Sequence, residues 1–452
     1  MEVDGPAAVV EVSVMRSTRD EGDVRGRDEH AGALAAPLSG AGELRRCVEE
    51  TVAAAPVLDM HTHLYPPRFG GLNLYGVDEL LTYHYLIAEL MRVTRTTPEQ
   101  FWELPKTAQA DLVWDELFVR RTPLSEAARG VVAVLSALGL DARAANLREA
   151  REFFADVRAE DYVNRVFETA RVERVVMTND PFDAAEARLW EEETEADPRF
   201  HAALRIDPLL VGWRGAVPAL AAQGFEVDEN LSGRSVAEAR RFLAKWVGRM
   251  KPLYMAVSLP DDFNFPADAD PLRARVLGDI VLPACLEHDL PLALMIGVRR
   301  GVNPRLRGAG DGLGRADVSA VERLCAAHPG HRFLVTFLSR ENQHELCVAA
   351  RKFSNLLPFG CWWFLNNPSI ISEITRERLE LLGTSFVAQH SDARVLDQLI
   401  YKWNHSRRLI ADALSEAYEA LQRDGRVVTR EEIARDAERL LAGNFRAWVG
   451  LS

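Results

Sequence analysis

Eight short apolar runs, each followed by a stretch with helical periodicity, constrain the fold of this 452-residue chain more than any other feature. Most of the runs are nearly continuous in apolar residues rather than alternating, which is typical of strands covered on both faces. Eight strand–helix units predict a (β/α)8 TIM barrel of the α/β class. The runs are residues 57–60, 173–177, 201–206, 253–258, 291–296, 332–337, 354–359 and 384–389.

A doubly wound open sheet is the structural alternative. It would leave some of the eight runs without a strand position, and the chain lacks the glycine-rich first turn that such folds use to bind nucleotides. We therefore expect the barrel, with a helical insertion after the first strand and helices at the C-terminal end.

Polar or aromatic side chains follow every one of the eight runs. The carboxyl ends of barrel strands meet at one face, and active sites of this fold lie there. A single pair of such residues is as typical of a solvated turn as of a site, but the repetition indicates one site at the barrel mouth. The residues are His61 and His63, Asn179 and Asp180, Arg205 and Asp207, Ser258 and Asp261, Arg299 and Arg300, Ser339 and Arg340, Trp362 and Trp363, and His390, Asp392 and Arg394.

The first of these groups, His61-Thr-His63, has the residue types and spacing of a metal site. The two-residue period of a strand places both imidazoles on the same side. Two adjacent imidazoles suit a divalent ion of borderline softness, such as zinc. Because 11 histidines in this chain would produce such a pair by chance roughly one time in four, the position at a strand end supports the metal hypothesis more than the pair itself.

Composition excludes several classes of partner. The formal net charge of −13 argues against nucleic acids and anionic membranes, because binding to them requires clustered Lys and Arg. No apolar run reaches the length of a membrane span. The five cysteines are odd in number, scattered and without a Cys-x-x-Cys pair, which favours reduced thiols and a cytoplasmic location.

The N-terminal segment differs from the rest of the chain. Residues 1–41 mix charge with Gly and Ala and show no sustained period, so we predict a disordered tail there and one barrel domain over residues 42–452. Glu2 and Asp4 stand where a signal peptide would need basic residues, so export is not expected.

Two regions outside the strand–helix repeat have clear helical patterns. An insertion over about residues 76–170 is predicted to begin a helix near Asp78, which would cap it, with His84 and Tyr85 near the middle of that helix. A helical region over residues 98–151 is expected to cap the barrel mouth. At the C-terminal end, residues 395–421 and 429–441 predict two helices, the second with a Thr429/Glu432 capping box and a stop at Gly443.

Taken together, these motifs resemble those of the uronate isomerase (glucuronate isomerase) family, a branch of the amidohydrolase superfamily. The His-x-His pair is common to that superfamily, whereas the Trp-Trp-Phe block and the Asp-x-Arg pair are more specific. The resemblance covers the chain from about residue 57 to its C-terminus. The segments that carry it are Asp59-Met-His-Thr-His-Leu64, His84-Tyr85, Met177-Thr-Asn-Asp-Pro-Phe-Asp183, Leu204-Arg-Ile-Asp-Pro208, Gly360-Cys-Trp-Trp-Phe364 and Ser391-Asp-Ala-Arg394.

Two departures from the family pattern, at Met295 and after Tyr85, indicate a divergent subgroup with altered substrate preference. Met295 stands where many members have a histidine, so one ligand of the wider superfamily is missing. The Leu-Ile-Ala-Glu segment after Tyr85 lacks the Lys-Trp-Arg continuation of the commoner branch. Lys251 precedes the fourth strand rather than ending it, so a second ion held by a modified lysine is not expected.

The resemblance implies aldose–ketose isomerisation of hexuronates, D-glucuronate to D-fructuronate and D-galacturonate to D-tagaturonate, through an enediol. His61, His63 and Asp392 would hold one divalent ion, which we expect to be zinc, and Asp392 would also take a proton during ring opening. Arg205 and Arg394 would bind a carboxylate or an enediolate oxygen through their planar guanidinium groups. We also expect a homo-oligomer.

Aromatic residues complete the predicted site. Tyr85, with His84 beside it, is the candidate for moving the C2 proton, although a tyrosine can act as a base near neutrality only if its pKa falls well below about 10. Trp362 or Trp363 would cover the apolar face of the sugar, and simple core packing is an equally typical role for either one.

Two other functions stay open at this point. A metal-dependent hydrolase or decarboxylase of the same superfamily is disfavoured by the absence of a lysine at the end of the fourth strand and by the Asp392/Arg394 pair. An inactive sugar-binding protein is disfavoured by the intact His61, His63 and Asp392 set, because a binding module has no need of a metal site at the barrel mouth.

Overall fold

The computed structural model describes residue 38 and residues 40–192 and 196–451. The tail predicted over residues 1–41 therefore lies almost entirely outside the described residues. Helix α1 (Ala41–Ala54) precedes the first strand and packs against the C-terminal helices. None of the helices in the described ranges combines the length and the apolar character needed to cross a membrane.

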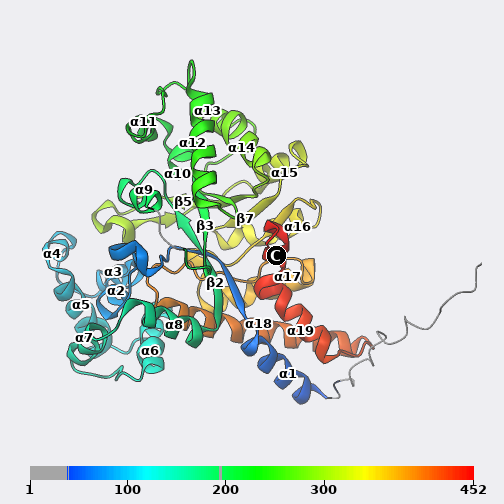
Figure 1. The fold of residues 1–452 in the computed structure, drawn as a ribbon. Helices are drawn as coiled ribbons and strands as arrows, with labels where there is room; N and C mark the ends of the chain where they lie inside the picture. The colour runs from blue at the N-terminus through cyan, green and yellow to red at the C-terminus, as the bar shows by residue number, and fades with distance from the viewer. Residues whose placement is uncertain (1–37, 39, 193–195, 452) are drawn as a thin grey trace, which may run out of the picture.

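A sheet of parallel strands forms the centre of the molecule, as the apolar runs predict (Figure 1). Neighbouring strands pair in the order β1-β2-β3-β4-β5-β7-β8, and buried side chains pack in the interior. A two-residue strand, β6 (Gly312–Leu313), pairs antiparallel with β5 outside this order. The parallel strands are β1 (Val57–Thr62), β2 (Val172–Asn179), β3 (Phe200–Arg205), β4 (Met255–Pro260), β5 (Leu292–Arg299), β7 (Phe333–Phe337) and β8 (Leu356–Pro358).

The eighth predicted run, residues 384–389, occupies its expected place without forming a regular strand, which corrects the prediction. It makes one isolated parallel bridge, between Phe359 and Val387. Beyond that bridge, the side-chain oxygen of Gln389 accepts a hydrogen bond from the backbone nitrogen of Cys361 over 2.6 Å. A side chain thus takes the place of a strand carbonyl, and the ladder ends.

The segment that follows completes the barrel by hydrogen bonding to the first strand. The backbone nitrogen of Asp392 donates to the carbonyl oxygen of His61 over 3.1 Å, and the nitrogen of His63 donates to the carbonyl oxygen of Ala393 over 2.7 Å. These bonds bring the last predicted site residues directly beside the first.

Helices cover the outside of the barrel between the strands. The succession of strand and helix is the one that the sequence predicts for this fold. The helices are α8 (Ala159–Ala170), α9 (Ala184–Glu191), α10 (Asp207–Val211), α11 (Trp213–Ala222), α12 (Ser235–Met250), α13 (Pro271–Arg275), α14 (Leu282–Glu287), α15 (Val318–Ala327), α16 (Gln343–Ala350) and α17 (Pro368–Leu382).

The insertion after β1 is helical, but its first helix is broken. Instead of one helix starting at Asp78, the chain forms two short helices separated at Thr82 and Tyr83, where Tyr83 is extended (ψ 143°). Asp78 does not cap the first of them, because its carboxylate accepts hydrogen bonds from Arg151 at 2.8–3.1 Å. The helices, which gather on one side of Figure 1, are α2 (Val77–Leu81), α3 (His84–Leu90), α4 (Pro98–Glu103), α5 (Lys106–Trp114), α6 (Glu126–Leu138) and α7 (Arg148–Ala155).

The C-terminal helices are α18 (Gln398–Arg423), α19 (Arg430–Glu438) and α20 (Asn444–Val449). The Thr429/Glu432 capping box that begins α19 is present as predicted. The predicted stop at Gly443 is wrong, because this residue has helical angles (φ −63°) and the chain passes through a π-helical turn into α20. A Cβ at Gly443 would lie 2.3 Å from a carboxylate oxygen of Glu438, so this glycine serves close approach rather than termination.

Candidate active site

A cavity of about 510 Å³ lies at the carboxyl ends of the barrel strands. Its walls also include residues of α2 to α5 and of the loop that follows β5. Of the region 98–151 that the sequence predicts as a cap, α4 and α5 contribute to the cavity wall together with the earlier helices α2 and α3, whereas α6 packs against α18. The predicted site residues that line the cavity are His61, His63, His84, Arg205, Trp362, Trp363, Asp392 and Arg394.

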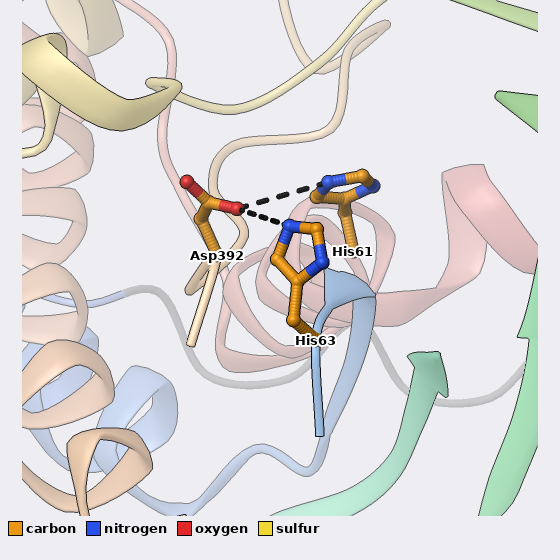
Figure 2. A group of neighbouring side chains, drawn as sticks. All are labelled: His61, His63 and Asp392. Atoms are coloured by element: carbon orange, nitrogen blue, oxygen red, sulfur yellow. Dashed lines mark ion pairs between the residues drawn. The ribbon is translucent and has the colours of Figure 1, made fainter. Parts of the chain in front are cut away.

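Two imidazoles and a carboxylate converge at one end of this cavity. One Asp392 carboxylate oxygen lies 3.3 Å from Nε2 of His63 and 3.7 Å from Nε2 of His61, and Figure 2 shows the three groups turned toward one another. Their candidate ligand atoms all lie within 4.8 Å of one another. Among the described residues, this is the group of histidine, cysteine and acidic side chains whose geometry could hold a metal ion.

The chemistry of this donor set fits a divalent cation. Burial lowers the pKa of His61 to about 3, with Asp392 opposing the shift, and burial together with Arg394 and Arg205 holds the pKa of His63 well below its usual value. Both imidazoles are therefore neutral near pH 7, and neutral imidazole is the form that binds metals. The Asp392 oxygen that faces them is buried and has no hydrogen-bond partner within the described residues. Such an orphan acceptor is expected where a cation completes the site.

The strand geometry and a buried carboxylate position the group. β1 carries His61 at its end, and His63 follows one residue beyond the strand. Asp59, fully buried on the same strand, accepts a hydrogen bond from the backbone nitrogen of Ser391 over 3.1 Å and another from Nε1 of Trp403 over 2.8 Å. Burial raises the pKa of Asp59 to about 6 against these hydrogen bonds. Asp59 thus holds the segment that carries Asp392 beside β1.

Met295, which departs from the family pattern, and Lys251, which bears on a second metal ion, both have clear places. Met295, on β5, lines the cavity where a histidine ligand would stand, and its thioether is not among the imidazole, thiolate and carboxylate groups that usually bind zinc. Lys251 precedes β4 and does not line this cavity. Neither residue supplies a ligand for a second ion beside His61, His63 and Asp392.

Three guanidinium groups face the cavity. Arg205 donates to an oxygen of Asp207 over 3.1 Å. Arg394 lies near Tyr83, where it opposes the rise that burial gives to the pKa of the tyrosine. Arg300, which follows β5, was assigned no role from the sequence although it belongs to the polar groups at the strand ends. It donates to Asp311 over 2.5 Å and its guanidinium carbon lies 5.6 Å from the ring centre of Trp363. The cavity can therefore bind an anionic ligand.

His84 and Trp363 form a hydrogen-bonded pair at the cavity wall. Nε1 of Trp363 lies 3.1 Å from Nε2 of His84. An indole nitrogen can only donate, so Nε2 of His84 accepts and its proton resides on Nδ1. Burial, with Arg394 nearby, lowers the pKa of His84 to about 3, so the ring is neutral. The Trp363 ring also stacks on Phe364, with centres 4.8 Å apart.

Tyr85 does not reach the cavity. Its hydroxyl is buried, has no hydrogen-bond partner among the described residues, and does not belong to the lining. Burial, and next Tyr83, raise its pKa well above the usual value, which is the opposite of what a base requires. The tyrosine that lines the cavity is Tyr83, which lies in the break between α2 and α3. The sequence signal for Tyr83 was only its position next to His84.

Further residues of the wall come from segments to which the sequence analysis assigned no site role. Glu79 and Lys106 of the insertion form an ion pair at the cavity, and Trp102 and Gln109 lie on the same side. Trp102 donates its indole proton to the carbonyl oxygen of Arg305 in the loop after β5, over 3.0 Å. No local sequence pattern predicts the contact between the insertion after β1 and the loop after β5.

Comparison with known structures gives the family. A uronate isomerase from Bacillus halodurans C-125 is 50% identical, with a TM-score of 0.89 over 92% of this chain and 98% of that one. A uronate isomerase from Thermotoga maritima is 14% identical (TM-score 0.72, 91% of this chain and 99% of that one) and a glucuronate isomerase from Caulobacter crescentus is 17% identical (TM-score 0.63, 92% and 96%), and both share the fold. No protein-family model and no curated protein matches the chain.

The family resemblance inferred from the motifs is therefore confirmed. The identity of 50% extends over almost the full length of both chains, and the fold is the TIM barrel that the eight runs predict. The present chain belongs to the uronate isomerase family.

Proposed function

We propose that this protein interconverts the aldose and ketose forms of hexuronates, D-glucuronate with D-fructuronate and D-galacturonate with D-tagaturonate. The observation that carries the proposal is the cavity that unites a neutral bis-imidazole and carboxylate group with three guanidinium groups, in a chain 50% identical to a uronate isomerase. The hydrolase, decarboxylase and inactive binding alternatives gain no support from the comparisons.

The reaction needs proton transfer between C2 and C1 through an enediol, together with stabilisation of a developing oxyanion. A divalent ion held by His61, His63 and Asp392, which we propose to be zinc, would supply Lewis-acid polarisation of a sugar oxygen. Arginine side chains near the ion would bind the carboxylate of the substrate. Arg205 and Arg394, already near the imidazoles, are the groups we assign to the carboxylate or the enediolate.

Asp392 is the residue we assign to proton movement. Within the described part of the cavity, it is the carboxylate beside the imidazoles that retains a buried oxygen without a hydrogen-bond partner, whereas Asp207 already accepts from Arg205. Such a carboxylate can take the proton of the anomeric hydroxyl in ring opening and pass it to the ring oxygen. Once it is free again, it can take the proton from C2 of the open chain and return it to C1. His84, neutral and protonated on Nδ1, acts as a hydrogen-bond donor rather than as a base.

The aromatic wall would orient the sugar. Trp362 and Trp363 both line the cavity, and Trp362 is almost fully buried. We assign Trp363, which holds His84 and lies below the guanidinium of Arg300, to the apolar face of the substrate, and Trp362 to packing at the cavity floor. Tyr85 has no role in this scheme, because its hydroxyl does not reach the cavity.

The test uses the full-length protein loaded with zinc. D-glucuronate and D-galacturonate are incubated in D2O, and both ketose formation and deuterium at C2 of the recovered aldose are followed by NMR. We expect ketose product and exchange at C2 at comparable rates, with Arg394→Met reducing turnover by orders of magnitude while the thermal midpoint stays unchanged. No turnover of any hexuronate, with hydrolysis of a lactone or amide instead, would replace the proposal by the hydrolase alternative.

A further inference from the structure

A buried tyrosine lies behind the proposed metal group. Tyr254 directly precedes β4, is fully buried inside the barrel, and has its hydroxyl between two groups of β1. The hydroxyl oxygen lies 2.6 Å from the carbonyl oxygen of Met60 and 3.3 Å from Nδ1 of His61. Figure 2 shows the other side of the His61 ring, which faces Asp392.

Counting protons at this hydroxyl fixes the direction of both hydrogen bonds. A carbonyl oxygen can only accept, so the single proton of the Tyr254 hydroxyl goes to Met60. The hydroxyl oxygen is then an acceptor toward His61, and Nδ1 of His61 has to carry the proton. The opposite tautomer would place two lone pairs against each other at 3.3 Å.

The ring contacts of Tyr254 keep the hydroxyl in this place. Its ring packs edge-on against Phe445 of α20, with ring centres 5.9 Å apart at 85°. Helix α20 also contacts β1. Helix α20, which follows Gly443, therefore packs against the ring of Tyr254, and the hydroxyl of Tyr254 in turn contacts His61.

We propose that Tyr254 is a positioning residue that holds His61 in the tautomer with the proton on Nδ1, so that the lone pair of Nε2 is presented to a divalent ion beside Asp392. The inference rests on the metal group of the proposed function. Groups that orient a ligating histidine through its other nitrogen typically change metal affinity 10–100-fold when removed.

The first measurement is made on the metal-free wild-type protein, and a variant serves only to assign the spectrum. The full-length protein, labelled with ¹⁵N at histidine, is freed of metal, and the tautomer of each neutral imidazole is determined from long-range ¹H–¹⁵N correlations, with His61 assigned through a His61→Asn spectrum. We expect His61 to carry its proton on Nδ1. A proton on Nε2 overturns the proposal, whatever the protein binds or catalyses.

The second measurement compares two tyrosine variants. Tyr254→Phe removes the hydroxyl behind His61, and Tyr162→Phe removes an equally buried hydroxyl that donates to Asp397 away from the metal group. Zinc affinity, measured by competition with a chromophoric chelator, should fall about 10–100-fold in Tyr254→Phe and stay within twofold of wild type in Tyr162→Phe. The tautomer of His61 should become mixed only in the first.

These outcomes separate the two proposals. An unchanged tautomer and an unchanged zinc affinity in Tyr254→Phe overturn the role of Tyr254 while leaving the metal group intact. Wild-type protein that binds no zinc, or binds it without isomerising any hexuronate, contradicts the proposed function. The His61 tautomer still decides the role of Tyr254 as an orienting group in that case. Should Tyr254→Phe fail to fold, the wild-type tautomer provides the decision alone.

Discussion

Asp392 and Trp363 both adopt left-handed backbone angles at the edge of the cavity, with φ of +50° and +47°. Residues other than glycine pay about 1–3 kcal/mol for such angles and keep them only where the surroundings hold them. Asp392 is held by its own backbone bond to the His61 carbonyl and Trp363 by its bond to His84. Gly360, three residues before Trp363, could not be replaced, because a Cβ there would lie 1.8 Å from Nδ1 of His390.

Replacing Asp392 by asparagine tests the assignment of the carboxylate. The amide keeps the shape and the backbone bonds but loses the charge, the proton acceptor and a strong metal ligand, so we expect kcat to fall about 10²- to 10⁴-fold with less bound metal. Asp279→Asn, at an exposed carboxylate, is the control and should leave both unchanged. Steady-state kinetics measures kcat, and metal analysis measures the bound metal in both variants. Activity within tenfold of wild type at full metal content would contradict the role of Asp392.

At the scale of elements, side-chain contacts link α4 to the loop after β5 at the cavity wall. Glu99 of α4 forms a bidentate pair with Arg305, with both distances 2.7 Å, and Trp102 donates to the carbonyl oxygen of Arg305. Because the ion pair is exposed, it contributes little on its own, and the indole bond is the more specific link. These contacts set the position of Trp102 in the cavity wall.

Trp102→Phe removes that link while keeping an aromatic ring. We expect KM for the hexuronate to rise several-fold, with kcat and the thermal midpoint little changed, because substrate contacts loosen while the reacting groups stay in place. Trp448→Phe is the matched control, since the indole nitrogen of Trp448 has no hydrogen-bond partner among the described residues. If both variants give the same KM as wild type, the loop does not depend on this bond.

A second link between elements is Arg407 of α18, which joins the ends of two other helices. Its guanidinium donates to the carbonyl oxygens of Val52 in the last turn of α1 and of Ala55 just after it, at 2.8 and 2.5 Å, and of Arg171 after α8, at 2.7 Å. Burial lowers its pKa to about 10, so it stays charged at neutral pH. The carbonyls at helix C-termini lack partners within their own helix, and Arg407 supplies them.

Arg407→Met leaves those carbonyls without partners. We expect the free energy of unfolding to fall by about 3 kcal/mol, since hydrogen bonds to charged groups are worth about 1.5–3 kcal/mol each and some are replaced by water. Urea denaturation measures this, and kcat should remain at the wild-type value. Arg408→Met, at the adjacent exposed position, is the control; an equal loss in both variants would show that charge, not helix linkage, is responsible.

Across the whole molecule, several histidines are buried in the neutral form. Burial lowers the pKa of His84, His390 and His405 each to about 3. In the unfolded chain these imidazoles protonate near the ordinary value of 6.5, so between about pH 6.5 and pH 3 the unfolded state binds more protons than the folded state. Stability is therefore complete above this window and falls as the pH drops through it.

We expect the thermal midpoint of the metal-free protein to decline steeply between about pH 7 and about pH 4. Calorimetry at a series of pH values measures this decline. His405 lies on α18 away from the proposed metal group and has a buried nitrogen without a partner in the described structure, so His405→Gln should flatten part of the decline. A midpoint that stays constant across this range in the wild type would contradict the neutral state of these histidines.

Local patterns in the sequence were enough for the architecture. Apolar runs of strand length separated by helical periods specify a parallel barrel because each such run must be covered on both faces, and this holds without knowledge of any contact. The paired His61 and His63, the polar residues after each strand and the capping box at Thr429 are likewise short-range features. The cavity therefore contains eight of the nine predicted site residues.

What the sequence left open depends on contacts between distant segments. Tyr83 lines the cavity in place of Tyr85, and it lies at a break between two helices. In the eighth run, the side chain of Gln389 accepts the hydrogen bond that a strand carbonyl would accept. The C-terminal helical segment continues through Gly443 instead of ending there. The roles of Arg300 and Tyr254 become visible only when β5, β4 and β1 are assembled. Periodicity determines which face of an element is buried, but only the tertiary structure determines what stands opposite that face, because hydrogen-bond direction and burial are properties of pairs.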